Sequence, residues 1–440
     1  MCTLHNARFI LLLSLALAFT DCATVKNGDS ISVDDYRRQI ASLQSKLSVN
    51  PGNADFLREL GVIYFLVKEY PQAKEHLERS YYIQPGDAKT IFYYGMALET
   101  LNNQQGALAV YINYTDFSAL SPYRKLIEGR YRALTRDIIE QQVQKLIADE
   151  AQLGEQNLSP ATVAVFPLSY QGTDQKYATL GKGLSELMIS DLAQVARLKL
   201  VERIRIEALL TELRFATSDK VDPASAPRLG KLLSAGRIVS GTYNVSADNV
   251  MRVDVVSLDI LERQFPPPAT QTDALENLFR LQKDLVFDVL DKMGITLTRV
   301  ERERIERIPT RNLQAFILYS IGIERDDARD FDGAAVYYQQ AVSLDPGFSQ
   351  AKTKAEAAEA LSAAGTKDRA VASAHKADPP PPPDAEALGS DFVNKRLETL
   401  GSNIGSSFYP SQDTRKPAEE GSNAGAPVGD LPKPPPPPVK

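Results

Sequence analysis

Residues 162–260 carry the hydrophobic pattern of a compact α/β unit. A short apolar run rich in β-branched residues, 162–168, predicts a buried strand, and apolar side chains at three- and four-residue intervals over 177–194 predict an amphipathic helix. A second short strand is expected at 198–201 and a second helix from 204 to about 215. This alternation of strand and helix indicates a sheet covered by helices.

The same unit ends in a predicted β-hairpin. Residues 237–246 and 249–260 form two alternating runs, and the short polar segment between them favours a tight turn. A helical turn at 228–233 precedes the hairpin. The expected fold class is therefore an α/β central domain, with a small mixed sheet and flanking helices, in a chain whose other folded parts are all-α.

The segment after the hairpin continues with helices. Three consecutive prolines, 266–268, fit an edge strand or a loop and not a central strand. An amphipathic helix is expected at 275–293, packing back on the sheet and ending at Gly294. A charged helix is expected at 300–308, where Pro309 stops it.

A period of 34 residues marks the region before the α/β unit. Small residues recur where two helices would approach closely, and the spacing resembles a tetratricopeptide repeat, which implies stacked helix pairs. Residues 35–49 have the pattern of the second helix of an incomplete earlier repeat, and a further copy near the C-terminus is followed by a helix at 350–364. The residues that carry the period are Leu57, Leu60, Gly61, Tyr64, Ala73, Leu77, Ser80 and Pro85, then Ile91, Tyr94, Gly95, Leu98, Ala107, Tyr111, Tyr114 and Ala119, and finally Leu318, Ile321, Gly322, Ala334, Tyr338, Ala341 and Pro346.

The inward-facing positions of the first two repeats are a candidate binding surface. Two interpretations fit them: a groove for a peptide or partner helix, or a face that packs on the neighbouring α/β unit. A lone third repeat cannot bury its own apolar face, so it is expected to dock on the charged helix at 294–310, on the α/β unit or on another subunit. The candidate groove residues are Arg58, Val62, Phe65, Phe92, Met96 and Glu99.

The first 21 residues have the composition of a secretory signal, with an apolar core at 9–19 that is too short to span a bilayer as a mature helix. Cys22 follows directly, and this arrangement resembles a bacterial lipoprotein leader, in which a peptidase cuts before a cysteine that carries a lipid. In that family a small residue precedes the cysteine, whereas this chain has Asp21. The alternative is cleavage after 16–18, which would leave Cys22 as a free thiol. The resemblance implies that Cys22 is the lipid attachment site and that Ala23 after it directs the protein to the outer membrane.

Composition and charge argue against several classes of function. The formal net charge is −6 and no basic domain stands out, so no nucleic-acid partner is expected. The three histidines, His5, His76 and His375, all lie outside the α/β unit. Both cysteines lie in the leader region, which leaves the folded part without a disulfide or a thiol nucleophile. We therefore expect no cofactor, no metal site and no enzyme activity.

Residues 181–183, Gly-Lys-Gly, suggest a phosphate-binding loop, but the pattern G-x-x-x-x-G-K-[ST] is not met. Lys176 stands five residues before Gly181, and Gly183 takes the place of the Ser or Thr. Glycines that allow helices to pack closely are the better interpretation. Glutamates 202, 207 and 212 recur at five-residue steps, which scatters them around a helix instead of pairing them as an acid and a base.

Three segments of the α/β unit occur in a characteristic order: V-A-V-F-P-L at 163–168, L-V-E-R-I-R-I-E-A-L-L-T-E-L at 200–213, and 222–243, which ends in G-R-I-V-S-G-T-Y. This set resembles the curli-assembly channel (CsgG-like) family and the related amino-terminal domain of TolB-type proteins. The resemblance implies a periplasmic, envelope-associated domain without a catalytic centre. Pore-forming members insert membrane-spanning hairpins whose strands need about 9 to 11 alternating residues, and no spare alternating segment remains here, which disfavours a pore.

Residues 365–440 are rich in Ala, Pro, Ser, Gly and charge, contain two five-proline runs, and are expected to form a disordered tail. Apolar residues at helical spacing from 122 predict one long helix connecting the repeats to the α/β unit. The expected domains are a signal peptide at 1–21, repeats at 35–121, a connecting helix at 122–156, a CsgG-like α/β domain at 161–293, a helix and single repeat at 294–364, and the tail at 365–440.

These features together predict a non-catalytic scaffold lipoprotein that is exported across the inner membrane and faces the periplasm. It would bind protein partners of the bacterial envelope through its helical repeats and CsgG-like domain, in outer-membrane or cell-wall assembly. The lipid on Cys22 would be its contact with the membrane, and it could form a homo-oligomer. The alternative is a subunit of an oligomeric outer-membrane secretion channel.

Overall fold

The computed structural model describes residues 33–154, 158–213, 221, 224–263 and 266–378. The leader, with Cys22, and the proline-rich segment after residue 378 lie outside the described residues. Within the described part of the chain, no helix combines the length and the apolar character needed to cross a membrane.

The centre of the fold is a mixed sheet with the order β3-β1-β4-β5-β6, and β2 pairs with β4 off this path. β1 is parallel to β3 and β4, whereas β5 is antiparallel to both of its neighbours, β4 and β6. The mixed sheet confirms the predicted fold class, and β6 lies at an edge directly after the three prolines. The strands are β1 (Ser159–Val165), β2 (Ser169–Tyr170), β3 (Lys199–Leu200), β4 (Ala235–Val245), β5 (Val250–Asp259) and β6 (Ala269–Ala274).

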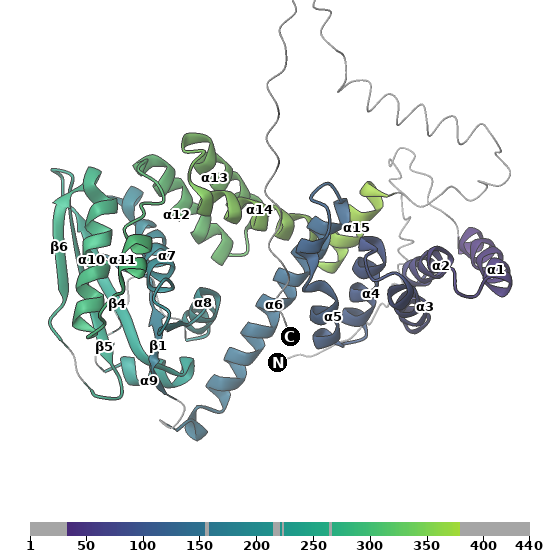
Figure 1. Cartoon of the computed structure of the whole chain (residues 1–440), viewed down its shortest axis with the longest axis horizontal. Coiled ribbons are helices and arrows are strands. Elements are labelled where there is room, and N and C mark those ends of the chain that lie inside the picture. The colour runs from purple at the N-terminus through teal and green to yellow at the C-terminus, as the bar shows by residue number, and fades with distance from the viewer. Residues whose placement is uncertain (1–32, 155–157, 214–220, 222–223, 264–265, 379–440) are drawn as a thin grey trace, which may run out of the picture. The chain divides into compact units, whose positions relative to one another are not determined.

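Helices cover both faces of the sheet, and the alternation along β1 shows why. Val163 and Val165 belong to one hydrophobic cluster with residues of α7 and α10, whereas Ala164 and Phe166 belong to another with residues of α8 and α9. Successive side chains of a strand point to opposite faces, so an apolar run such as β1 requires a layer on each side. Figure 1 shows these helices around the sheet. They are α7 (Leu180–Leu192), α8 (Arg203–Glu212), α9 (Ala226–Leu233), α10 (Leu278–Lys292) and α11 (Arg299–Ile305).

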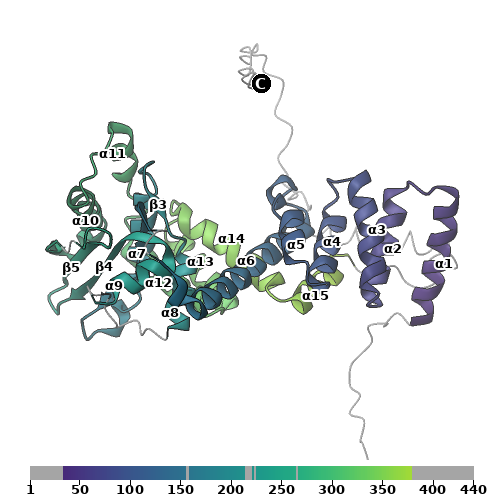
Figure 2. The same ribbon diagram turned by 90° about the horizontal axis from the view of Figure 1, so that it is seen from below.

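The region before the sheet is a succession of packed helices, as Figure 2 shows. The second helix of each pair packs closely on the first where the predicted small residues lie: a Cβ on Gly61 would lie 2.5 Å from Leu77 Cγ, and one on Gly95 would lie 2.1 Å from Tyr111 Cε1. Asn53, Asp87 and Asn103 cap α2, α4 and α5 with their side chains. The predicted helix pairs are therefore present, while their membership of the tetratricopeptide family stays a prediction. The helices are α1 (Val33–Val49), α2 (Ala54–Leu66), α3 (Tyr70–Ile83), α4 (Ala88–Thr100) and α5 (Gln104–Tyr111).

The long helix α6 (Pro122–Ala148) does more than connect two parts. Its C-terminal half contributes Ile139 and Val143 to the hydrophobic cluster that contains Ala164 and Phe166. The layer that covers this face of the sheet therefore begins inside α6, before the predicted domain start at residue 161.

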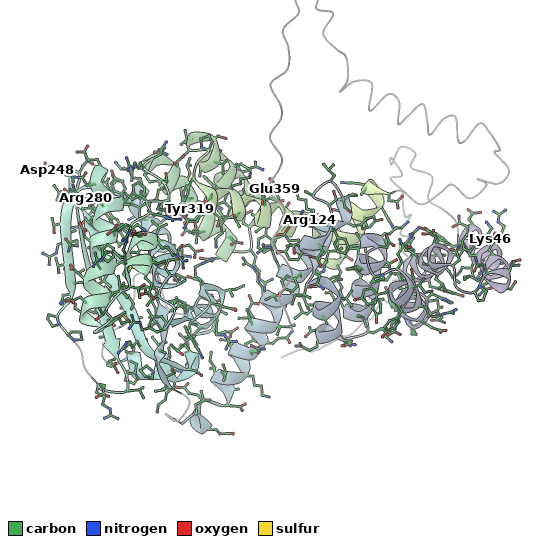
Figure 3. The ribbon with its side chains drawn as sticks, viewed as in Figure 1. Lys46, Arg124, Asp248, Arg280, Tyr319 and Glu359 are labelled. Carbon is green, nitrogen blue, oxygen red and sulfur yellow. The ribbon has the colours of Figure 1, made fainter. Side chains whose placement is uncertain are left out.

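The third repeat, formed by the C-terminal helices, docks on the α/β unit and on α6. α12 (Leu313–Asp327) packs on α7, α13 (Phe331–Leu344) packs on α12, and α14 (Ser349–Ala364) packs on α6. Of the predicted alternatives, the α/β unit is therefore the docking surface, with α6 added. In Figure 3, Glu359 of α14 lies near Arg124 at the start of α6, and its carboxylate accepts a hydrogen bond from Lys125 at 2.6 Å.

The predicted tail boundary at residue 365 is wrong. The chain continues from α14 into a further helix, α15 (Lys367–Ala377), which Thr366 caps and which packs on α14 and α6. Ala370 and Ala374 of α15 are fully buried. The sequence did not predict this helix, because the segment is rich in alanine and lies next to a proline run, and two buried alanines give only a weak hydrophobic period.

Candidate functional site

The predicted groove residues lie together, but they are interior residues. Val62, Phe65, Phe92 and Met96 belong to one hydrophobic cluster, and each is less than a tenth exposed. Glu99 is 7% exposed, and only Arg58 remains partly accessible, paired with Asp55, Glu59 and Asp87. The prediction that these residues line an open groove is therefore wrong.

The cover over this face comes from α6 and α15. Tyr123 and Leu126 of α6 and Ala370 and Ala374 of α15 belong to the same hydrophobic cluster as Phe92. Beyond α15, the Asp378 carboxylate lies 2.9 Å from Lys89 Nζ of α4. The other interpretation, in which this face packs on the α/β unit, is also not observed. The face is covered by α6, which was predicted to be a connecting helix, and by α15, which was predicted to be part of the tail.

A buried arginine fixes this arrangement. Arg130 of α6 donates from Nε and Nη2 to the two carboxylate oxygens of Glu99, at 3.1 and 2.5 Å. Its Nη1 donates to the backbone oxygens of Ala364 and Gly365, both at 3.0 Å. Charge-assisted bidentate bonds of this kind are strong and directional, so Arg130 ties the turn between α14 and α15 to α4.

A second set of charged residues lies where the α/β unit meets the third repeat. We call it the ionic junction; its members are Lys182, Glu186, Arg203, Glu207, Asp326 and Asp327. Arg203, at the start of α8, lies 2.5 Å from Asp327 Oδ1 and 3.0 Å from Glu186 Oε2, and its side chain is 11% exposed. Lys182 of α7 lies 2.8 Å from the other oxygen of Asp327. The sequence prediction contained none of these ion pairs.

The two carboxylates that share Lys182 and Arg203 have opposite pKa shifts. Burial alone would raise the pKa of Asp327, but the close Arg203 and Lys182 outweigh it and hold that pKa below its usual value. Burial raises the pKa of Glu207, and the negative charge of Asp327 adds to the effect. Glu207 lies farther from the cations, at 3.7 Å from Arg203 and 3.9 Å from Lys182, so it gains less from them.

A cleft of about 250 Å³ opens beside the ionic junction. Further ion pairs surround it: Arg136 lies 2.7 Å from Asp326, Lys354 lies 2.9 Å from Glu186, and Arg132 lies 2.8 Å from Glu128. The walls of the cleft therefore carry fixed charges next to apolar side chains such as Ile204 and Leu361. The residues that line it are Tyr131, Arg132, Thr135, Arg136, Arg203, Ile204, Asp326, Lys354, Ala357 and Leu361.

The side chains that line the cleft supply four cationic groups, the carboxylate of Asp326 and the hydroxyl groups of Tyr131 and Thr135. Across the described residues there is no group of three or more His, Cys, Asp or Glu side chains placed to hold a metal ion. The expectation of a non-catalytic protein stays a prediction.

Gly183 acts as the sequence predicted and allows α7 to pack on α12, whereas Gly181 lies against the backbone that follows β1. A Cβ on Gly181 would lie 1.9 Å from the Leu168 carbonyl oxygen, and one on Gly183 would lie 2.1 Å from Ser320 Oγ of α12. Lys182 between them forms part of the ionic junction. A sequence signal for the junction existed in the adjacent acids Asp326 and Asp327, but nothing local identified their partners.

Comparison with known proteins shows that one part of the chain is similar to a known family. The family model described as curli production assembly/transport component CsgG matches residues 135–247. This segment runs from the second half of α6 to the turn of the β4–β5 hairpin and is similar to that family, as three sequence segments predicted. No curated protein matches the chain.

Among solved structures that match, one is the LpoB C-terminal domain from Salmonella enterica, in a selenomethionine form. Its sequence is 11% identical, the TM-score is 0.22, and the alignment covers 30% of this chain and 95% of that chain.

Proposed function

We propose that this protein is a non-catalytic scaffold of the bacterial envelope, in which a CsgG-like domain and helical repeats bind protein partners of outer-membrane or cell-wall assembly. The observation that carries the proposal is the family match over residues 135–247, whose description names curli production, assembly and transport. The lipid on Cys22 would hold the scaffold at the outer membrane, on the periplasmic side.

The arrangement of helices supports a scaffold. Arg130 ties α6 to the N-terminal helices and to the turn before α15, and the ionic junction joins α7 and α8 to α12. These buried pairs bring segments far apart in the sequence together around the CsgG-like domain. Large apolar side chains remain exposed on the N-terminal helices, with Tyr82 76% and Ile83 51% exposed, and such residues suit a protein contact.

Crosslinking in intact cells followed by mass spectrometry tests this proposal. The expected crosslinks join the described helices or the CsgG-like domain to other envelope proteins, or to second copies of the chain. A replacement of Tyr82 by Glu should weaken partner crosslinks if the exposed end of α3 contributes. Crosslinks to cytosolic proteins alone would contradict the envelope scaffold.

The anchor has its own test, because the chain offers a matched pair of cysteines. Cells that express the full chain are labelled with a radioactive fatty acid. Label is expected on the wild type and on Cys2→Ser but not on Cys22→Ser. Label that survives Cys22→Ser would show that the lipid is not attached there.

The alternative function is a subunit of an oligomeric outer-membrane secretion channel, which the word transport in the family description favours. Purified full-length protein in planar bilayers distinguishes the two functions. Stepwise conductance that depends on the protein would support the channel and overturn the scaffold proposal. The expected result is no protein-dependent conductance.

A further inference from the structure

The cleft beside the ionic junction has cationic walls. Four of its lining residues carry a positive charge and only Asp326 carries a negative one. They come from three helices, Arg132 and Arg136 from α6, Arg203 from α8 and Lys354 from α14. Residues from separate helices thus converge on one small volume, as in ligand sites built between helices.

Three of the carboxylates that pair with these cations are not among the residues that line the cleft. Glu128, which pairs with Arg132, and Glu186, which pairs with Lys354, do not line the cleft. Asp327, the closest partner of Arg203, does not line it either. The charged groups that face the cleft are therefore mostly cationic.

Hydrogen-bond donors remain on these cations. A guanidinium carries five N–H donors and an ammonium three. Arg132 donates from Nε to Glu128 and from Nη2 to Tyr114, and Arg136 donates from Nη1 and Nη2 to Asp326. Both arginines therefore keep further N–H groups. Their side chains are 34% and 14% exposed, and that of Lys354 is 26% exposed, so a ligand from solvent can reach them.

We propose that this cleft is a binding site for a small oxyanion, the phosphate or carboxylate group of a soluble ligand. Arginine forks match the planar geometry of such groups, and Lys354 adds a point charge. A volume of about 250 Å³ holds a ligand the size of a phosphate ester or a short dicarboxylate. The site is independent of the proposed scaffold function, and either can fail without the other.

Isothermal titration of the full-length protein tests the site, with inorganic phosphate in one arm and succinate in the other. Sodium chloride at the same ionic strength serves as the titration blank. The variant is Arg132→Gln combined with Lys354→Gln, which leaves Arg203, Asp326 and Asp327 in place. The matched control combines Arg299→Gln with Lys176→Gln, both of which are exposed and neither of which lines the cleft.

Saturable binding of phosphate, succinate or both is expected for the wild type and the control. Removing two charged donors should weaken it by about tenfold or more. Binding in the phosphate arm alone identifies a phosphorylated ligand, and binding in the succinate arm alone a carboxylate. No saturable binding in either arm, or equal binding by wild type and variant with an unchanged melting temperature, would overturn the site. If the variant does not fold, Arg132→Lys and Lys354→Arg singly replace it, and unchanged affinity in both would also overturn the proposal.

Discussion

Asp327 and Glu207 share the same cations, and their positions shift their pKa values in opposite directions. Asp327 touches both Lys182 and Arg203 at 2.8 and 2.5 Å, whereas Glu207 stands more than an ångström farther from each. Two carboxylates in one buried site repel one another, so the pKa of the better-paired Asp327 is lowered and that of Glu207 is raised. Their substitution should therefore have different consequences.

Replacing Asp327 with Asn should lower the free energy of unfolding by about 3 to 5 kcal/mol, because Lys182 and Arg203 would keep buried charges without their closest partner. Urea denaturation with an unchanged slope measures the change. The control is Asp137→Asn, which breaks a half-exposed pair with Arg329 and should cost about 0 to 1 kcal/mol. Equal losses in the two variants would mean that the junction does not stabilise the fold.

Replacing Glu207 with Gln should change how stability depends on pH. Because the folded-state pKa of Glu207 is raised, its contribution is fully present below the unfolded pKa and is lost as pH rises through the folded value. Asp327 has the opposite sign, so its contribution is lost as pH falls through its lowered folded pKa. The Gln variant should therefore gain stability relative to wild type as pH rises. Melting temperatures across a pH series measure this, and parallel curves for the two proteins would contradict it.

At the scale of elements, α15 is the helix that the sequence did not predict. Its buried contacts are made by alanines, and its ends are tied down by the Thr366 cap and by the Asp378 contact with Lys89. Buried alanines leave little room between helices, so a larger side chain at these positions cannot be accommodated without moving α15.

Ala374→Leu should therefore loosen α15 and destabilise the protein by about 1 to 3 kcal/mol through overpacking. Ala372→Leu, on the exposed side of the same helix, is the matched control and should be nearly neutral. Hydrogen exchange of residues 367–377 reads out the docking directly. If the amide hydrogens of residues 367–377 exchange at the same rate in both variants, the buried alanines do not hold α15 in place.

Most elements were predictable because each depends on a local period. The strands of the hairpin, α7, α10 and the stacked helix pairs all lie within a few residues of their expected positions. α11 is shorter than expected: the capping box of Thr298 and Glu301 sets its start, and it ends at Ile305, before Pro309. The open groove failed because a repeat pattern specifies which side chains face inward and says nothing of what covers them.

At the scale of the whole molecule, close approaches between distant helices hold the parts together. Gly183 of α7 lies against Ser320 and Phe316 of α12, with no space for a side chain. The third repeat is thereby joined to the hydrophobic cluster of the sheet, to which Phe316 and Tyr319 also belong. We expect this contact to make the repeat and the α/β unit unfold together.

Gly183→Ala should separate α7 from α12 and destabilise the protein by about 1 to 3 kcal/mol. Limited proteolysis should then cut residues 313–364 earlier than the sheet, and calorimetry should show a broadened or split transition. Gly86→Ala, where a Cβ would meet nothing within 4 Å, is the control. A single sharp transition in both variants would show that the repeat does not depend on this contact.

The sequence alone determined most of the elements, the mixed sheet and the resemblance of its central segment to the CsgG-like family, because periodicity and turn chemistry act over a few residues. Only the tertiary structure decided which helices cover the repeat face and which charges meet in the junction. Lys182 and Arg203 reach Asp327 across 145 and 124 residues of sequence, and no local pattern encodes such a pairing. Contacts of that range exist only once the helices have packed, and the cleft with its cationic walls is a product of the same packing.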